Sequence, residues 1–178
     1  MVENFAKQLA QQGKAAFEAG RFIEAAQIFE DARAAFERSG NKLDAAEMAN
    51  NLSVALLKAG EAESAFKAAA GTEEIFAQVG DKHRQAIALS NQASALQELG
   101  QLEQALKLYQ QSSNLFEQCG DREMRSYVLR SMSALYIRMG KQFNALASMS
   151  EALSSTKKLT LKERLLKKLL NLPFRIIR

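Results

Sequence analysis

Proline and cysteine each occur only once in this chain of 178 residues, and tryptophan is absent. Because the single proline is Pro173, the first 172 residues contain none of the residue that most often interrupts helices. The lone Cys119 excludes an internal disulfide, and no apolar run approaches the ~18 residues of a membrane span. The opening residues, MVENFAKQLAQQGK, lack the apolar core of a secretory signal, so we expect an intracellular, cytoplasmic protein.

Residues that carry out chemistry are also scarce. His83, the only histidine, and Cys119 lie near turn-forming glycines, and two such residues do not make a metal site. Nothing in the sequence resembles a paired acid and base, and the glycines stand apart instead of forming a phosphate-binding loop. We therefore predict that the protein is not an enzyme and that it has no metal and no cofactor.

Positive charge is concentrated at the C-terminal end. The formal net charge is +4, but residues 157–178 alone hold eight lysines and arginines against a single acid, Glu163. The other 156 residues therefore carry a net charge of −3. A mildly acidic body argues against a nucleic-acid partner and confines the basic surface to the tail.

The abundance of alanine and the spacing of the glycines predict the fold class. Thirty alanines and a 47% share of hydrophobic residues predict helices that bury a sizeable core. Seven of the nine glycines recur every 20 residues, at positions 20, 40, 60, 80, 100, 120 and 140. Since glycine ends helices in a left-handed conformation without steric cost, each predicts a turn between helices of up to about 19 residues. The sequence thus predicts an all-α fold.

The turns are of two alternating kinds, which makes the true period 40 residues. Asn41, Asp81 and Asp121 follow alternate glycines, and their side chains can accept hydrogen bonds from the free amides of a starting helix. Each unit is therefore predicted to be a hairpin of a helix A and a helix B. The remaining turns continue with Arg21, Glu61, Gln101 and Lys141.

Small and large side chains follow the same period. Small residues at matched places on helices A and B allow close approach within a hairpin, and phenylalanines near the end of helix B are expected to pack against the next unit. In the second unit Ala69 replaces a bulky residue and Gly71 lies in mid-helix, so this helix B is predicted to be thin, kinked or loosely packed. Thr156 and Thr160 take the phenylalanine and glycine places of the fourth unit, so the repeat ends there. The recurring residues are Gly13, Ser53, Ala93 and Ser133 on helix A, and Ala25, Ala65, Ala105, Ala145, Phe36, Phe76 and Phe116 on helix B.

Residues 9–36, LAQQGKAAFEAGRFIEAAQIFEDARAAF, and residues 89–116, LSNQASALQELGQLEQALKLYQQSSNLF, resemble tetratricopeptide repeats (TPR). The 40-residue unit is similar to the long-repeat subclass found in Pins-type polarity regulators and kinesin light chains. The resemblance implies a right-handed α-α superhelix of four hairpins over residues 1–156, with units at about 1–40, 41–80, 81–120 and 121–156. It also implies that the A helices line a concave trough that binds another polypeptide.

A groove for a peptide is therefore expected on the A helices. In the subclass that the chain resembles, an asparagine at the places of Asn51 and Asn91 holds the backbone of a bound peptide. Basic residues near them would favour an acidic ligand only weakly, because Glu18, Glu47 and Glu98 project from the same helices. The alternative is a solvated helix face without a ligand. The predicted groove residues are Lys14, Asn50, Asn51, Val54, Lys58, Ser90, Asn91, Ser94, Tyr127, Arg130 and Arg138.

The basic tail, residues 157–178, predicts one more helix. Thr160 and Glu163 have the spacing of a capping box, and Pro173 ends the helix near Leu172. Leucines occupy about half of its circumference. We favour a cap that covers the apolar end of the last hairpin; the alternatives are an anchor on anionic membrane and a helix that docks in a partner. For the remaining segment, PFRIIR, three placements are left open: it packs back on the array, inserts elsewhere or contacts a second copy of the chain.

Taken together, these features predict a protein-interaction module, an adaptor or scaffold that binds a peptide segment of another protein in its trough. The alternative function is a peripheral membrane or tethering protein that uses residues 157–178 on anionic lipid. The sequence identifies neither the partner nor the oligomeric state, and self-association is left open.

Overall fold

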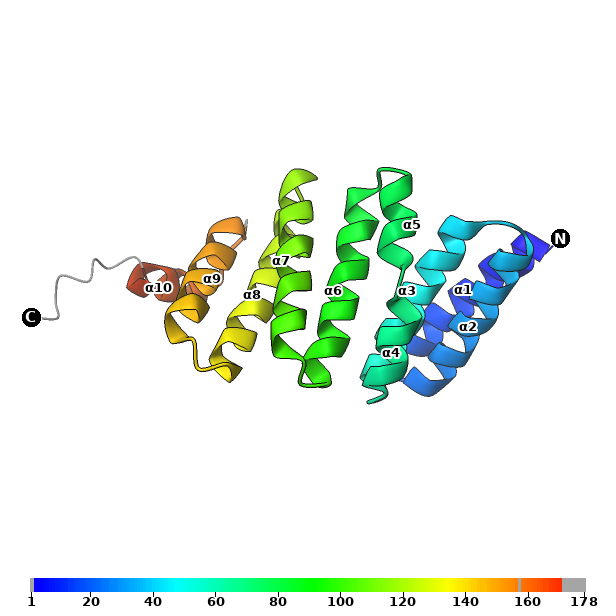
Figure 1. The fold of residues 1–178 in the computed structure, drawn as a ribbon, viewed down its shortest axis with the longest axis horizontal. Helices are drawn as coiled ribbons and strands as arrows, with labels where there is room; N and C mark the ends of the chain where they lie inside the picture. Colours follow the sequence, from blue (N-terminus) through cyan, green and yellow to red (C-terminus); the bar gives the residue numbers. More distant parts are fainter. Residues whose placement is uncertain (1, 157, 171–178) are drawn as a thin grey trace, which may run out of the picture.

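The computed structural model describes residues 2–156 and 158–170, which form ten α-helices and no strand. Figure 1 shows the helices side by side in one elongated row, with α1 and α10 at opposite ends. The long helices α1, α2, α3, α6, α7, α8 and α9 run antiparallel in succession, with α4 and α5 together taking the place of one helix between α3 and α6. The helices are α1 (Val2–Glu18), α2 (Phe22–Arg38), α3 (Lys42–Lys58), α4 (Ala62–Ala69), α5 (Thr72–Gln78), α6 (Lys82–Glu98), α7 (Leu102–Gln118), α8 (Arg122–Arg138), α9 (Gln142–Ser155) and α10 (Leu161–Leu170).

The seven evenly spaced glycines lie in the turns, as predicted. Their φ angles fall between 71° and 88°, in the left-handed region where glycine carries no steric cost. In the first turn the backbone N–H of Gly20 donates to Phe17 O, and that of Arg21 donates to Ala16 O. This pattern closes the last turn of α1 and satisfies carbonyls that a helix end leaves free.

Alternate turns begin the next helix with a side-chain cap. Asn41 accepts a hydrogen bond from the backbone N–H of Asp44, Asp81 from Arg84 and Asp121 from Met124. The other turns, before α2, α4, α7 and α9, have no side-chain cap. The predicted 40-residue period is therefore confirmed in the backbone.

The second helix B is broken in two, which confirms the predicted defect at Gly71. That glycine has a φ of 79°, and it separates α4 from α5. The hydroxyl of Thr72 donates to Ala69 O at 2.7 Å and lies 3.1 Å from Asn50 Oδ1 on α3. The side-chain amide of Gln92 on α6 donates to the same Ala69 carbonyl at 3.1 Å. Neighbouring helices thus satisfy a carbonyl that the break leaves without a helical partner.

The apolar core is divided at the same place. One buried cluster is formed by α1, α2 and α3, and a second by α6, α7, α8 and α9. Between them lies a small cluster of Ala46, Phe76 and Ala88, in which Phe76 of α5 is fully buried. The guanidinium of Arg84 stacks over the Phe76 ring at 5.0 Å and forms ion pairs with Asp81 and Glu47. Phe76 therefore links the two halves of the row.

The last helix, α10, begins with the predicted capping box. Thr160 N donates to Glu163 Oε2 at 2.8 Å, and Glu163 N donates to Thr160 Oγ1 at 3.3 Å. The helix packs on α9 at the end of the row, as predicted for a capping helix, but its leucines do not form the expected cover, because no residue of α10 is buried and its leucines are largely exposed. The expected end near Leu172 lies outside the described residues, as does the PFRIIR segment.

Candidate peptide-binding trough

Three hollows follow the A helices α1, α3, α6 and α8, and we call them together the trough. The N-terminal hollow has a volume of 560 Å³ and lies mainly between α1 and α3. The central hollow, of 440 Å³, is lined from α3, α6 and α8, and the C-terminal hollow, of 480 Å³, by α8 and the segment after α9. Their volumes lie within the range of pockets that bind small ligands.

The N-terminal hollow has an apolar floor and a charged rim. Phe29 of α2 forms the floor, and the side chains of Phe17, Met48 and Val54 line the walls. Gly13 of α1 lies directly against the Phe29 ring, since a Cβ at residue 13 would come within 2.8 Å of it. The rim and remaining walls consist of Ala10, Gln11, Lys14, Glu18, Glu47 and Asn51.

The central hollow is polar. Tyr109 Oη and Ser94 Oγ share a hydrogen bond of 2.9 Å in its wall, and burial raises the pKa of the Tyr109 hydroxyl above its ordinary value. Lys58 and Glu98 supply charges of opposite sign, and Tyr127 is 59% exposed beside them. The wall therefore offers both hydrogen-bond donors and acceptors without a dominant charge.

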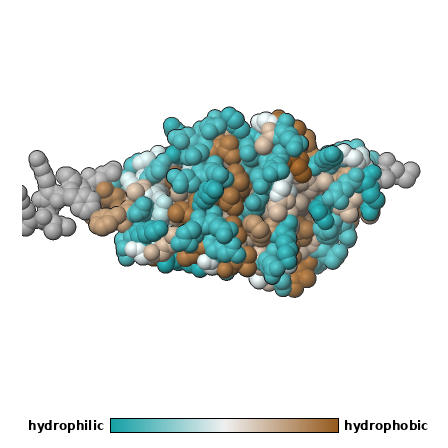
Figure 2. All heavy atoms as spheres, viewed as in Figure 1, coloured by the Kyte–Doolittle hydropathy of each residue, from teal (hydrophilic) through white to brown (hydrophobic). Residues whose placement is uncertain are grey.

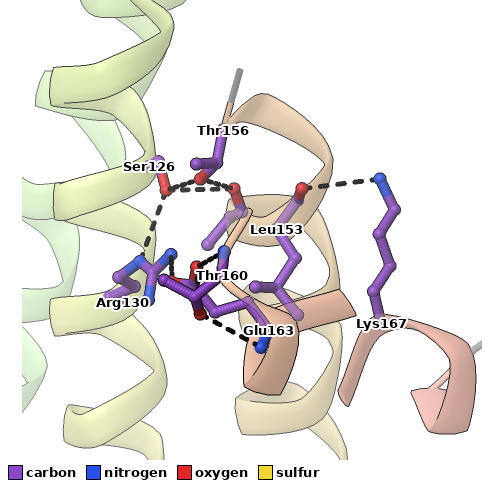
Figure 3. Close-up of polar contacts among 8 residues, drawn as sticks. Ser126, Arg130, Leu153, Thr156, Thr160, Glu163 and Lys167 are labelled. Carbon is purple, nitrogen blue, oxygen red and sulfur yellow. Dashed lines mark hydrogen bonds and ion pairs between the residues drawn. The ribbon is translucent and has the colours of Figure 1, made fainter. Parts of the chain in front are cut away.

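The C-terminal hollow lies between α8 and the segment that follows α9. Tyr127 and Arg130 line it from α8, and Lys158 lines it from the segment that leads into α10. The guanidinium of Arg130 forms an ion pair of 2.8 Å with Glu163 of α10 (Figure 3). The Arg130 side chain is therefore paired with another residue of the same chain.

Seven of the predicted groove residues line these hollows. They are Lys14, Asn51 and Val54 in the first, Lys58, Ser94 and Tyr127 in the second, and Tyr127 and Arg130 in the third. Arg138 lies on the adjacent surface, where its guanidinium donates to Gln97 O at 3.3 Å.

Asn50 and Ser90 are corrections to the predicted groove, because each is only 5% exposed. Asn50 faces the broken helix and contacts Thr72, and Ser90 donates to Ile87 O in its own helix. Compared with the predicted orientation, the A helices are rotated about their axes, so that these two side chains point between hairpins instead of into the trough. Asn91 is half-buried and does not line the three hollows.

Phe29, Met48 and Tyr109 are trough residues that the sequence prediction missed. Phe29 and Tyr109 come from helices B, whereas the predicted groove residues all come from helices A, and both are at least 95% buried. The available signal was the small residue on the facing helix, Gly13 opposite Phe29 and Ala93 in the third unit, which leaves room for a ring to reach the trough.

The described residues hold neither a metal-binding cluster nor a membrane-spanning helix. Among residues 2–156 and 158–170 there is no group of three histidine, cysteine or acidic side chains placed to hold a metal ion. None of the helices in those ranges has the length and apolar content needed to cross a bilayer. Hydrophilic atoms cover most of the surface seen in Figure 2, and apolar atoms form narrow bands between them.

Comparison with known proteins identifies the repeat. Residues 84–158 match the family model described as the tetratricopeptide repeat. BtubC (BKLC) from P. vanneervenii has a similar fold, at 15% identity and a TM-score of 0.76, with 95% of this chain and 72% of that chain covered.

A kinesin light chain protein with nearly identical TPR-like repeats, from Podosopora anserina, matches at 15% identity and a TM-score of 0.74, with 96% of this chain and 84% of that chain covered. No curated protein sequence matches the chain. The predicted all-α TPR superhelix and the likeness to kinesin light chain repeats are confirmed. At these identities the structural likeness concerns the fold alone.

Proposed function

We propose that this protein is a non-enzymatic, cytoplasmic adaptor or scaffold that holds a peptide segment of another protein in the trough of its four-unit array, residues 1–156. TPR arrays are in general protein-interaction modules. The observation that carries the proposal is the N-terminal hollow, which combines an apolar floor, an asparagine in its wall and a rim of both charges.

Each part of that hollow has a role in the proposed complex. The side-chain amide of Asn51 donates to and accepts from the backbone of an extended peptide, whatever its sequence. An apolar side chain of the peptide fills the space between Phe17 and Met48, which provides most of the affinity. Lys14 and Glu18 select charges beside that side chain, while Asn91 and Arg138, which lie outside the hollows, contact the peptide beside them.

The test compares three asparagines. Asn51→Leu removes the hydrogen-bond donor and acceptor of the asparagine side chain in the N-terminal hollow. Asn91→Leu makes the same change outside the hollows, and Asn114→Leu, on the exposed face of α7, is the matched control. Capture of partners from the native cell, followed by mass spectrometry and a titration with the captured peptide, should show weakening by about tenfold for Asn51→Leu. Unchanged capture of partners by Asn51→Leu would contradict peptide binding in the trough.

A second candidate function is a peripheral membrane or tethering protein that uses residues 157–178 on anionic lipid. The observation that favours it is the exposure of the leucines of α10, of which Leu161 is 87% exposed. The two functions are compatible, since the trough lies on the A helices and α10 lies beyond α9.

A further inference from the structure

The two faces of α10 differ in what they contact. Glu163, Lys167 and Leu170 are half-buried and, with the neighbouring Leu166, turn toward the rest of the protein. Residues spaced by three and four along a helix share a face, so these four form one side of α10. We call it the inner face.

Polar contacts fix the inner face to the end of the row. Glu163 Oε1 accepts from the Arg130 guanidinium at 2.8 Å, and Lys167 Nζ donates to Leu153 O at 3.4 Å (Figure 3). Glu163 also accepts from Thr160 in the capping box. The only acid of residues 157–178 is therefore turned toward the body and neutralised there.

The outer face carries leucines instead. Leu161, Leu165 and Leu169 are 87%, 60% and 56% exposed, and we call them the leucine stripe. At about 100° per residue, their side chains fall within about 80° of arc and span about 12 Å along the helix. These three side chains have no apolar partner surface in the described part of the chain.

Bases flank the stripe on both sides. Lys168 lies about 20° beyond Leu161, and Lys162 lies about 20° beyond Leu169, when the helix is viewed along its axis at about 100° per residue. Arg164 follows Lys168 on the same side. All three bases are exposed, and the acid is on the opposite face. Long basic side chains beside an apolar stripe can reach lipid headgroups while the stripe enters the acyl region.

We infer that the leucine stripe inserts into the surface of an anionic bilayer, with Lys162, Arg164 and Lys168 bound to the headgroups and the inner face holding the TPR row above the membrane. This inference rests on the second proposed function and names the face that performs it. A symmetric pairing of two copies through the same stripe would bring these bases close to their own equivalents, which like-charge repulsion opposes.

The closing experiment measures cosedimentation of the full chain with vesicles of phosphatidylcholine, with and without about 30% phosphatidylserine. The stripe variant is Leu161→Gln/Leu165→Gln/Leu169→Gln, and its control is Phe5→Gln/Ile23→Gln/Val79→Gln, three apolar side chains of comparable exposure elsewhere. The base variant is Lys162→Gln/Arg164→Gln/Lys168→Gln, and its control is Lys42→Gln/Lys82→Gln/Lys107→Gln, three exposed lysines on other helices.

We expect the natural chain and both controls to bind the anionic vesicles equally, and the stripe and base variants to bind at least about tenfold more weakly. If the natural chain binds no vesicle, the membrane function and the inference both fall, while peptide capture by the trough is unaffected. If only the base variant loses binding, the membrane function stands and insertion of the stripe is overturned. A natural chain that dimerises without lipid, and a stripe variant that is monomeric, would assign the stripe to a contact between copies.

A fluorescence measurement reports insertion directly. Because the chain has no tryptophan, Leu165→Trp gives a single emitting residue on the stripe, and Ile23→Trp gives a matched one on α2. Anionic vesicles should shift the emission of the residue-165 variant to shorter wavelength and protect it from a soluble quencher, and should leave the residue-23 variant unchanged. Binding without any change at residue 165 would overturn insertion.

Discussion

Gly13 of α1 lies directly against the ring of Phe29 in α2, because a Cβ at residue 13 would come within 2.8 Å of ring atoms Cδ1 and Cε1. Phe29 is buried and forms the floor of the N-terminal hollow. Any side chain at residue 13 would push the ring toward the hollow or separate the two helices. The missing side chain therefore sets both the packing of the first hairpin and the shape of the hollow.

Gly13→Ala should lower stability even though alanine is the better helix former. The gain in helix propensity is about 1 kcal/mol, whereas overpacking costs about 1–3 kcal/mol, so we expect a net loss of about 1 kcal/mol in urea unfolding. Adding Phe29→Leu removes the ring atoms that clash, so Gly13→Ala should cost less in that background. A Gly13→Ala variant at least as stable as the natural chain would show that the contact is not tight.

Gly71→Ala tests the break between α4 and α5 by the sign of its effect. In a continuous helix this change would stabilise by about 1 kcal/mol. Since Gly71 has a φ of 79°, we expect instead a loss of about 1 kcal/mol, similar to the loss for Gly20→Ala in the first turn. Thermal unfolding of the two variants measures this, and stabilisation by Gly71→Ala would mean that the second helix B is continuous in solution.

Phe76→Ala should uncouple the two halves of the row. The ring is fully buried between the larger clusters, so its removal should cost about 3–5 kcal/mol. Phe116→Ala, at the equivalent place inside the second cluster, is the matched control. Hydrogen exchange followed by mass spectrometry should show α1–α3 and α6–α9 opening separately only in Phe76→Ala. Joint opening of both halves in that variant would contradict the division of the core.

The attachment of α10 should depend on pH through Glu163. Hydrogen bonds from the backbone N–H and hydroxyl of Thr160, followed by that from Arg130, hold the pKa of this carboxyl below its usual value. A carboxyl with a lowered folded-state pKa contributes its full stabilisation above the unfolded pKa and loses it as the pH falls through the folded pKa. Hydrogen exchange in residues 161–170 should therefore accelerate, after correction for intrinsic rates, below about pH 4.3.

Glu163→Gln removes the titrating group, so its α10 should lose this pH dependence, while Glu103→Gln on α7 should retain it. An unchanged pH profile in Glu163→Gln would show that another group holds the helix.

The regular features of the fold could be predicted because they repeat. Evenly spaced glycines predicted the turns, Asn41, Asp81 and Asp121 predicted the capped starts, and Gly71 predicted the defect in the second helix B. The rotation of the A helices could not be predicted as well, since the predicted face included Asn50, which instead contacts Thr72 across the break. Local spacing assigns residues to a face, but packing between hairpins decides where that face points.

The orientation of α10 could not be predicted from the sequence either. Its leucines predicted an apolar face turned inward, as is usual for the end of a solenoid. In the structure Glu163, paired with Arg130, lies on the side of α10 that faces the row, while Leu161, Leu165 and Leu169 are exposed. The ion pair joins residues that are far apart in the chain. Floor residues contributed by helices B, such as Phe29, were missed for a related reason, because access to them depends on what the facing helix lacks.

Site-specific photocrosslinking tests the central claim, a partner segment held in the trough, most directly. A photoreactive residue at Val54, in the wall of the N-terminal hollow, should crosslink to the captured partner, and one at Ile23, exposed on α2, should not. Crosslinks from residue 23 in the absence of crosslinks from residue 54 would contradict the account, because the partner would then bind the outer helices.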